Sequence, residues 1–290
     1  MPTEFITFAF MKIKKYKTLF VESLSFLYDK DEAENFFFLI LKKIKGLSRV
    51  DLALNPELEF PEKEAQQLDF YLNELQKQIP IQYLLGTTEF FGLTLNVNPN
   101  VLIPRPETEE LVDWIVRENQ SKTDLKILDI GTGSGCIAIS LAKHLKAEVF
   151  AFDISENALQ TAQFNADQNQ VFVHFVEFDI LNDLWEGEPF DIIVSNPPYV
   201  RESEKHEMKP NVLENEPHSA LFVSNENPFI FYEKITDFAQ KHLTKNGQLF
   251  FEINQYLGQE TVKILEQKDL KSIRLKKDIY GNDRMILAYF

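Results

Sequence analysis

The sequence predicts an α/β protein in which a small helical bundle precedes a doubly wound parallel sheet with an antiparallel hairpin at one edge. Three observations predict this fold. Apolar residues recur at helical spacing over roughly the first eighty residues, and no strand pattern interrupts them. After Asp124, short apolar runs alternate with helical patterns, as in a sheet whose parallel strands are joined by helices. The chain closes on two β-prone runs with no room for a helix between them.

These patterns divide the chain of 290 residues into three predicted segments. Residues 1–79 are expected to form a helical domain, residues 80–104 a β-hairpin linker, and residues 105–290 the larger α/β domain. A clean amphipathic pattern begins only at Met11, so residues 1–10 are interpreted as an unstructured extension or an upstream start. A chain of this length is comfortable for two domains, each with its own core.

The first two segments are predicted from periodicity and from residues that start or stop helices. A first helical pattern runs from Leu19 to Leu27, a second begins at Asp31 and is closed by Gly46, and Pro61 opens a third. The third is expected to end at about Gln78. In the linker, glycines act as turn formers between short β-prone runs: Gln82–Leu85, Gly86, Thr88–Phe91, Gly92 and Leu93–Val97.

The α/β segment is predicted as an alternating series of elements, preceded by a helix that begins near Pro106. Strands are expected at Lys126–Ile130, Glu148–Asp153, Val171–Phe175, Phe190–Ser195 and Gln248–Ile253. Helices are expected at Cys136–Leu145, Glu156–Gln168, Pro228–His242 and Gly258–Glu266. The closing hairpin is expected at Ile273–Lys277 and Arg284–Phe290.

Charge and composition argue against several classes of protein. The formal net charge is −15, from 30 Lys and Arg against 45 Asp and Glu. Because nucleic-acid binders gain most of their affinity by neutralising phosphates, direct nucleic-acid binding is not expected. The single cysteine, Cys136, excludes an intramolecular disulfide and a multi-cysteine metal cluster, and no metal is expected. No apolar run approaches the ~20 residues that span a bilayer, so we expect a soluble, cytoplasmic protein. It is also expected to be a monomer.

A glycine-rich turn follows the first predicted strand of the sheet, in Leu128-Asp-Ile-Gly-Thr-Gly-Ser-Gly-Cys136. In doubly wound sheets, ligands bind at such turns, outside the carboxyl ends of the strands. The spacing G-x-G-x-G lacks the last glycine of the dinucleotide fingerprint, and no Gly-Lys-Ser/Thr follows, which excludes a triphosphate loop. The candidate cofactor-binding residues in this turn are Gly131, Thr132, Gly133, Ser134 and Gly135.

Two acids and an apolar residue extend this candidate site to the next two strands. Asp153 ends the second predicted strand, where a carboxylate can accept from ribose hydroxyls, while Ser155 is the better candidate for capping the following helix. Asp179 can accept from an adenine amino group while Ile180 covers the ring, although a solvated loop acid is the competing interpretation. Asp129 either holds a cofactor ammonium or only ties down the glycine turn. Together these residues predict an adenosine-type cofactor.

The second candidate site is Asn196-Pro-Pro-Tyr199, which follows the fourth predicted strand. Strand four neighbours strand one in the commonest doubly wound order, so its end should face the glycine turn. Two prolines fix an extended backbone and leave carbonyl groups unpaired. The side-chain carbonyl of Asn196 and the backbone carbonyl of Pro197 can then accept both hydrogens of an –NH2 group, and Tyr199 offers an aromatic face. The candidate catalytic residues are therefore Asn196, Pro197 and Tyr199. These three and Pro198 are the candidate substrate-binding residues. Asn196 is also a candidate cofactor-binding residue.

This arrangement suits a nitrogen whose lone pair is delocalised, as in a carboxamide or an aromatic amine. Fixed carbonyl dipoles on both N–H groups favour the sp³ character and positive charge that develop as the nitrogen attacks. No strong base is required, since the nitrogen becomes far more acidic once it is alkylated. An amide and a nucleobase both meet this requirement, so the motif alone leaves the substrate open.

The tetrad resembles the (Asp/Asn/Ser)-Pro-Pro-(aromatic) motif of amino-methyltransferases, which modify adenine, cytosine, guanine and protein glutamine. Further segments narrow the resemblance to the peptide-chain release factor glutamine methyltransferases, from about residue 11 to the C-terminus. These segments are Pro80-Ile-Gln-Tyr-Leu-Leu-Gly86, Glu89-Phe-Phe-Gly92, Ile103-Pro-Arg-Pro-Glu-Thr-Glu109, Glu216-Pro217 and Tyr280-Gly-Asn-Asp-Arg284. Ile180 departs from members with an aromatic residue there. Arg105 and Glu107 are interpreted as belonging to a helix start rather than to the chemistry.

The resemblance implies a class I methyltransferase fold, a Rossmann-like doubly wound sheet, with S-adenosylmethionine as the cofactor. It implies methyl transfer to the side-chain amide nitrogen of the glutamine in the Gly-Gly-Gln motif of class I peptide chain release factors. It places cofactor binding on Gly131–Gly135, Asp153 and Asp179, and amide recognition on Asn196–Tyr199. The alternatives are a methyltransferase acting on an exocyclic amine of a nucleic acid, which the acidic charge disfavours, and a cofactor-binding module without turnover.

Overall fold

The computed structural model describes residues 11–290, which fall into two compact units, residues 11–85 and residues 86–290. The first unit has one hydrophobic core and the second has two, one on each face of its sheet. The division lies between Leu85 and Gly86, inside the segment that the sequence analysis assigns to the linker. The interpretation of residues 1–10 as an extension lies outside the described residues.

The first unit is a helical bundle, as predicted. Its helices are α1 (Ile13–Leu24), α2 (Lys30–Lys45), α3 (Arg49–Leu54), α4 (Glu62–Gln76) and α5 (Ile81–Leu85). The side chain of Asp29 caps α2 by accepting from the backbone N–H of Glu32 at 2.8 Å, and Gly46 ends the helix at a φ of +69°. Start and stop residues in the sequence thus set the bounds of the longest helix of this unit.

Three elements of this unit differ from the prediction. Helix α1 begins at Ile13 and ends at Leu24, whereas the predicted pattern runs from Leu19 to Leu27. The short helix α3 was missed, because it begins at the capping box of Ser48 and Asp51 but is too short to show a helical period. The expected strand over Gln82–Leu85 is wrong, since these residues belong to α5, where the N–H of Tyr83 donates to the carbonyl of Pro80 at 3.0 Å. A short apolar run fits a strand and a buried helical turn equally well.

The second unit opens with the predicted hairpin, in which β1 (Thr87–Phe90) pairs antiparallel with β2 (Leu93–Asn96). Phe91 and Gly92 form its turn, both at positive φ, 48° and 75°. A two-residue turn of this kind matches the twist of the flanking strands. The hairpin is attached to α8 (Glu156–Asn169), because the side chain of Asn165 accepts from the backbone N–H of Asn96 at 2.6 Å.

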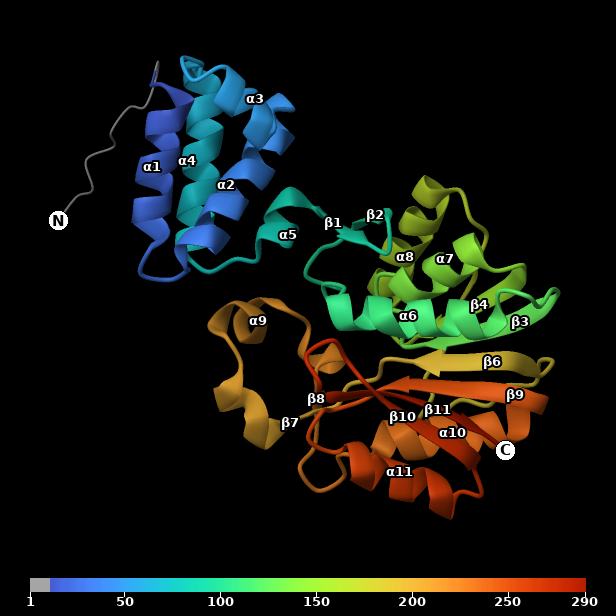
Figure 1. The fold of residues 1–290 in the computed structure, drawn as a ribbon. Helices are drawn as coiled ribbons and strands as arrows, with labels where there is room; N and C mark the ends of the chain where they lie inside the picture. Colours follow the sequence, from blue (N-terminus) through green and yellow to red (C-terminus); the bar gives the residue numbers. More distant parts are fainter. Residues whose placement is uncertain (1–10) are drawn as a thin grey trace. The chain divides into compact units, whose positions relative to one another are not determined.

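A central sheet of seven strands has the order β10-β11-β9-β6-β3-β4-β5 (Figure 1). The strands are β3 (Leu125–Ile130), β4 (Ala147–Asp153), β5 (His174–Glu177), β6 (Phe190–Ser195), β9 (Leu243–Glu252), β10 (Lys271–Lys277) and β11 (Asp283–Tyr289). Strands β3 to β6 and β9 pair in parallel, and β11 is antiparallel to β9 and β10. The predicted sheet is confirmed. Because β6 lies beside β3, the two candidate motifs follow neighbouring strands.

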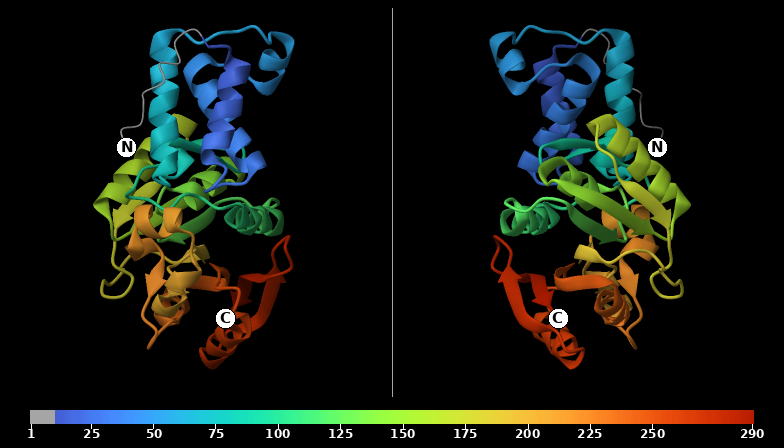
Figure 2. Two further views of the ribbon diagram at one scale, coloured as in Figure 1. Left: turned by 90° about the vertical axis from the view of Figure 1, so that its left-hand side faces the viewer. Right: turned by 90° about the vertical axis from the view of Figure 1, so that its right-hand side faces the viewer.

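Helices cover both faces of this sheet (Figures 1 and 2). One face carries α6 (Pro106–Asn119), α7 (Cys136–His144) and α8, and the other carries α10 (Ile230–His242) and α11 (Gly258–Gln267). Successive residues of β3 show the alternation, since Ile127 is buried in the first core and Leu128 in the second. The central strands β3 and β6 are buried on both faces, which explains why they appear in the sequence as short continuous apolar runs.

The third predicted strand is displaced. It was expected at Val171–Phe175, and β5 begins at His174. The residues before it cap α8, because Gln170 adopts a left-handed conformation and the N–H of Val171 donates to the carbonyl of Ala166 at 3.1 Å. This helix-ending motif consumes the first residues of the apolar run.

The segment between β6 and α10 contains short elements that the sequence analysis did not predict. They are β7 (Val200–Arg201), η1 (Glu202–Glu207), α9 (Pro210–Asn215), η2 (His218–Ala220) and β8 (Phe222–Val223), where η marks a 3₁₀ helix. None of them is long enough to show a period. Parallel pairing of β7 with β8 returns the chain toward the end of β6, so that residues near 220 line the same cavity as Asn196.

Candidate active site

A cavity of about 300 Å³ lies in the second unit, outside the carboxyl ends of β3, β4 and β6. Both candidate motifs line it, as expected for a doubly wound sheet. The lining residues that the sequence analysis singled out are Gly131, Thr132, Gly133, Ser134, Asp153, Asp179, Ile180, Asn196, Pro197 and Pro198. Gly135 and Tyr199 lie outside this lining in the described structure.

The glycine turn approaches the cavity with its backbone. Gly133 has a φ of +55°, and a Cβ built on it would have no heavy atom within 4 Å, so the space above it is open to a ligand. Gly135 serves a different purpose. A Cβ there would lie 2.8 Å from Cδ1 of Ile139 and 3.1 Å from Cβ of Ala162, so the absence of a side chain allows α7 and α8 to approach closely.

Asp129 fixes the glycine turn through hydrogen bonds to its buried carboxylate. Its carboxylate is fully buried and accepts from the hydroxyl of Thr132 at 2.6 Å and from the N–H of Ala138 at 3.2 Å. Burial raises the pKa of Asp129 to about 7. Of the two interpretations from the sequence, the contacts match the one in which this acid ties down the loop.

Asp153 joins the second strand to the glycine turn. Its Oδ2 accepts from the N–H of Gly133 at 2.8 Å and its Oδ1 from the N–H of Ser155 at 2.9 Å. Burial raises the pKa of Asp153. Ser155 caps α8 as expected, because its hydroxyl accepts from the N–H of Ala158 at 3.2 Å. Asp153 therefore orients the turn and lines the cavity at the same time.

Asp179 and Ile180 reach the cavity from the loop after β5. The carboxylate of Asp179 accepts from the N–H of Leu181 at 2.9 Å and from the side-chain amide of Asn182 at 2.7 Å. These contacts fix the acid within its loop, and its place in the lining brings it to the same cavity as Asp153.

At the end of β6, Asn196 is held by a side chain from a distant part of the chain. Its amide nitrogen Nδ2 donates to the hydroxyl oxygen of Thr108, on α6, at 3.3 Å. One residue earlier, the hydroxyl of Ser195 donates to the backbone carbonyl of Ile130 at 2.7 Å, which ties the ends of β6 and β3 together. The motif and the glycine turn are therefore coupled by a direct contact between their strands.

Tyr199 packs beside the cavity, and its aromatic face for the substrate stays a prediction. Its ring packs against the core between the sheet and α10, and its hydroxyl donates to Oε1 of Glu252 at 3.1 Å. Burial raises the pKa of the Tyr199 phenol above its usual range. The side-chain amide of Asn254 donates to the Tyr199 carbonyl at 3.1 Å, so side chain and backbone are both fixed from β9 and the loop after it.

Sequence reasoning missed Thr108 and Glu252. Thr108 donates its hydroxyl hydrogen to Oε2 of Glu252 at 2.6 Å, and both side chains are buried. A signal was present in the run Phe250-Phe-Glu-Ile253, where an acid interrupts the most apolar stretch of a predicted central strand. Buried acids are rare unless they are paired, and such a position marks a candidate site.

The ion pair between Arg105 and Glu216 joins the start of α6 to the segment after β6. Nη2 of Arg105 lies 2.6 Å from Oε1 of Glu216, whose side chain is only 1% exposed, and the N–H of Ile103 donates to the other oxygen at 3.1 Å. Pro106 is the first residue of α6, as predicted. Arg105 also lines the cavity.

The cysteine at this site is a neutral thiol. Cys136 lines the cavity at the start of α7, and burial raises its pKa to about 12.

No group of three His, Cys, Asp or Glu within residues 11–290 is placed to hold a metal ion. No helix in the described part of the chain is long and apolar enough to cross a membrane.

Comparisons of the sequence with known families and relatives agree with this geometry. The family described as "Methyltransferase small domain" matches residues 111–222, and "PrmC N-terminal domain" matches residues 19–86. A release factor glutamine methyltransferase from Flavobacterium psychrophilum is 56% identical over 284 residues, covering 97% of this chain and 100% of the relative. One from Bacteroides thetaiotaomicron is 44% identical over 269 residues, with 92% and 96% covered.

Solved structures resemble the fold. A methyltransferase from Pyrococcus furiosus has a TM-score of 0.53 at 20% identity, covering 75% of this chain and 98% of that one. A 16S rRNA N2 G1207 methyltransferase from T. thermophilus, in complex with AdoMet and guanosine, has a TM-score of 0.52 at 20% identity, with 70% and 49% covered. At this identity the likeness shows the fold alone.

The sheet order, the cavity at the ends of its strands and the matched catalytic domain define a class I methyltransferase. Identity of 56% over nearly the whole length, together with the matched N-terminal domain, identifies the family more closely. The chain belongs to the release factor glutamine methyltransferases.

Proposed function

We propose that the protein transfers a methyl group from S-adenosylmethionine to the side-chain amide nitrogen of the glutamine in the Gly-Gly-Gln motif of class I release factors. The observation that carries this proposal is the position of Asn196, an amide-accepting residue at the lining of a cofactor-sized cavity, in a chain 56% identical to a release factor glutamine methyltransferase. The enzyme is further proposed to act as a monomer in the cytoplasm.

The residues of the cavity fit S-adenosylmethionine. The open space above Gly133 admits a ligand close to the backbone, and Asp153 and Asp179 offer carboxylate oxygens to ribose hydroxyls and to the adenine amino group. Ile180 and Ile154 add apolar surface for the ring. When bound, the cofactor supplies an electrophilic methyl group on a sulfonium centre.

The residues after β6 are proposed to hold the amide. The side-chain carbonyl of Asn196 and the backbone carbonyl of Pro197 accept the two hydrogens of the glutamine –NH2 group. Their fixed dipoles stabilise the positive charge that develops on nitrogen as the N–C bond forms, and the contacts orient the lone pair toward the methyl group. One N–H proton leaves after transfer, when the nitrogen is strongly acidic, so no buried base is needed. Tyr199 supports this backbone through its contacts to β9 and to the loop after it.

Labelled S-adenosylmethionine tests the proposal directly. The protein is incubated with a release factor, with the same release factor carrying Gly-Gly-Ala in place of Gly-Gly-Gln, and with DNA and RNA. We expect label only in the unaltered release factor. Label in nucleic acid alone would instead support an exocyclic-amine methyltransferase, and label in the Gly-Gly-Ala protein would place the modification elsewhere.

A further inference from the structure

The buried carboxylate of Glu252 contacts both Thr108, on α6, and Tyr199, in the segment after β6. Glu252 lies at the end of β9 and is 1% exposed. Its Oε2 accepts from the hydroxyl of Thr108 at 2.6 Å, and its Oε1 accepts from the hydroxyl of Tyr199 at 3.1 Å. Because burial of an unpaired carboxylate is costly, both oxygens depend on these partners.

The direction of these hydrogen bonds determines how Asn196 is oriented. A threonine hydroxyl has one hydrogen, and an ionised carboxylate can only accept, so Thr108 gives its hydrogen to Glu252. The oxygen of Thr108 can then only accept, and its contact with Asn196 at 3.3 Å must use the amide –NH2. The side-chain carbonyl of Asn196 is therefore the end that remains for a ligand in the cavity.

Nothing in the shape of the side chain sets this orientation, since the oxygen and nitrogen of a carboxamide have nearly the same size. A flipped Asn196 would present an –NH2 group to the –NH2 group of the glutamine, so two donors would face each other. The identity of the atom that Thr108 contacts thus decides whether the site accepts an amide nitrogen.

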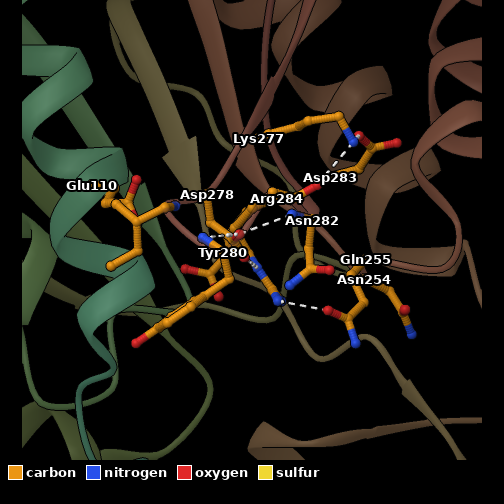
Figure 3. Close-up of polar contacts among 12 residues, drawn as sticks. Glu110, Asn254, Gln255, Lys277, Asp278, Tyr280, Asn282, Asp283 and Arg284 are labelled. Atoms are coloured by element: carbon orange, nitrogen blue, oxygen red, sulfur yellow. Dashed lines mark hydrogen bonds and ion pairs between the residues drawn. The ribbon is translucent and has the colours of Figure 1, made fainter.

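A guanidinium stands near this carboxylate. Burial raises the pKa of Glu252, and the hydrogen bond from Thr108 and the charge of Arg284 act against that rise. Figure 3 shows how Arg284 is held: its Nε lies 3.1 Å from Oδ2 of Asp278, and its Nη2 donates to Gln255 at 3.2 Å. Asp278 is itself buried and accepts from the backbone N–H of Asn282 at 2.9 Å.

We propose that Glu252 is a positioning residue which, through Thr108, fixes the amide of Asn196 with its carbonyl oxygen toward the substrate nitrogen. This proposal rests on the proposed function, because it assumes that the substrate group is an amide. The relay, defined as Glu252 together with Thr108, then makes the site select an –NH2 group over a carboxylate at the position of the substrate amide.

The test compares Thr108→Val, which keeps the shape and removes the hydroxyl, with Thr108→Ser, which keeps the hydroxyl. With a Gly-Gly-Gln peptide, we expect Thr108→Val to lower kcat by about tenfold to a hundredfold. We expect Thr108→Ser to stay within about threefold of the wild type, and the Kd for S-adenosylmethionine to be nearly the same in all three proteins. Turnover of the wild type in the same assay tests the proposed function separately.

A second readout reports the orientation itself. A Gly-Gly-Glu peptide presents only acceptors to the site, so it should inhibit the wild type poorly. In Thr108→Val the freed amide can turn its –NH2 group to the carboxylate, and inhibition by this peptide should become stronger while kcat for Gly-Gly-Gln falls. A general loss of structure would instead lower both the inhibition by Gly-Gly-Glu and the turnover of Gly-Gly-Gln.

Glu252→Met removes both acceptor oxygens at the other end of the relay. Its effect on kcat should not add to that of Thr108→Val in the double variant, since both remove the same orientation. The proposal is overturned if Thr108→Val keeps normal turnover, if Thr108→Ser loses as much as Thr108→Val, or if Gly-Gly-Glu inhibition fails to strengthen.

Discussion

The proposed cofactor half and the proposed amide half of the cavity are built in different ways. In the cofactor half, the contacts join groups closer in sequence, as where Asp153 accepts from the N–H of Gly133, 20 residues away in the turn after the neighbouring strand. In the amide half, the contacts join side chains far apart in sequence: Asn196 to Thr108 across 88 residues, and Thr108 to Glu252 across 144. The cofactor half is therefore a local property of the sequence, and the amide half is a property of the folded sheet.

The largest expected effect comes from removing the amide acceptor. Asn196→Ala should lower kcat by roughly 10²-fold or more, by analogy with the loss of one dipole that stabilises a transition state. The Kd for S-adenosylmethionine should change little, because the carboxylates and the glycine turn remain. Single-turnover rates and calorimetry measure the two quantities. Near-normal turnover would remove Asn196 from the chemistry.

The complementary change is in the cofactor half. Asp153→Ala should weaken S-adenosylmethionine binding by about tenfold or more, since it removes a proposed ribose acceptor and the anchor of the Gly133 N–H. At saturating cofactor, kcat should recover most of its value. Asp153→Asn keeps one acceptor oxygen and serves as the matched control, with a smaller loss. Unchanged affinity by calorimetry in the alanine variant would exclude a cofactor role for Asp153.

These opposite outcomes would separate the two halves. The two halves also differ in how far they could be predicted from the sequence. The alternation of elements, the start of α6 at Pro106, the cap at Ser155 and the adjacency of both motifs follow from local rules and strand order. Thr108 and Glu252 could not be paired from the sequence, because no local rule connects the first turn of a helix to the end of a strand 144 residues later.

The wrong strand at Gln82–Leu85 has a related physical origin. The run at Gln82–Leu85 is too short to distinguish strand from helix, and in the structure it forms α5, from which Leu84 and Leu85 pack against the core of the first unit. The hydrogen bond from the Tyr199 hydroxyl to Glu252, which holds this residue beside the cavity, could not be predicted from the sequence either. Where a side chain points depends on partners that only the fold supplies.

A smaller effect is expected on stability, and it tests the packing beneath the cofactor half. Gly135→Ala should lower the free energy of unfolding by about 1–3 kcal/mol, because it combines a φ of +82° with a contact of 2.8 Å to Ile139. Gly281→Ala is the matched control, with a φ of +85° and nothing within 4 Å, and it should lose less. Urea unfolding measures both. Equal losses would show that torsion alone determines the cost.

The change expected to affect turnover least is Asp129→Asn, which tests the buried acid by its pH dependence. The pKa of Asp129 is about 7 in the folded protein, against about 3.9 in an unfolded chain. The folded state therefore holds this proton more tightly, so the stability contributed by the protonated acid is present at low pH and is lost as pH rises through about 7. The variant should lack this loss. Urea unfolding of both proteins at several pH values checks it, and parallel curves would contradict the assignment.

The measurement that most directly tests the difference between the halves is the position of the methyl group on an intact release factor. After incubation with S-adenosylmethionine, tandem mass spectrometry of the peptide that contains Gly-Gly-Gln should show one added methyl group on the glutamine side-chain amide. Asn196→Ala with saturating cofactor should leave that peptide unmodified. A methyl group on any other atom of the release factor, or the same yield from the variant, would contradict the account of Asn196 as the residue that receives the amide.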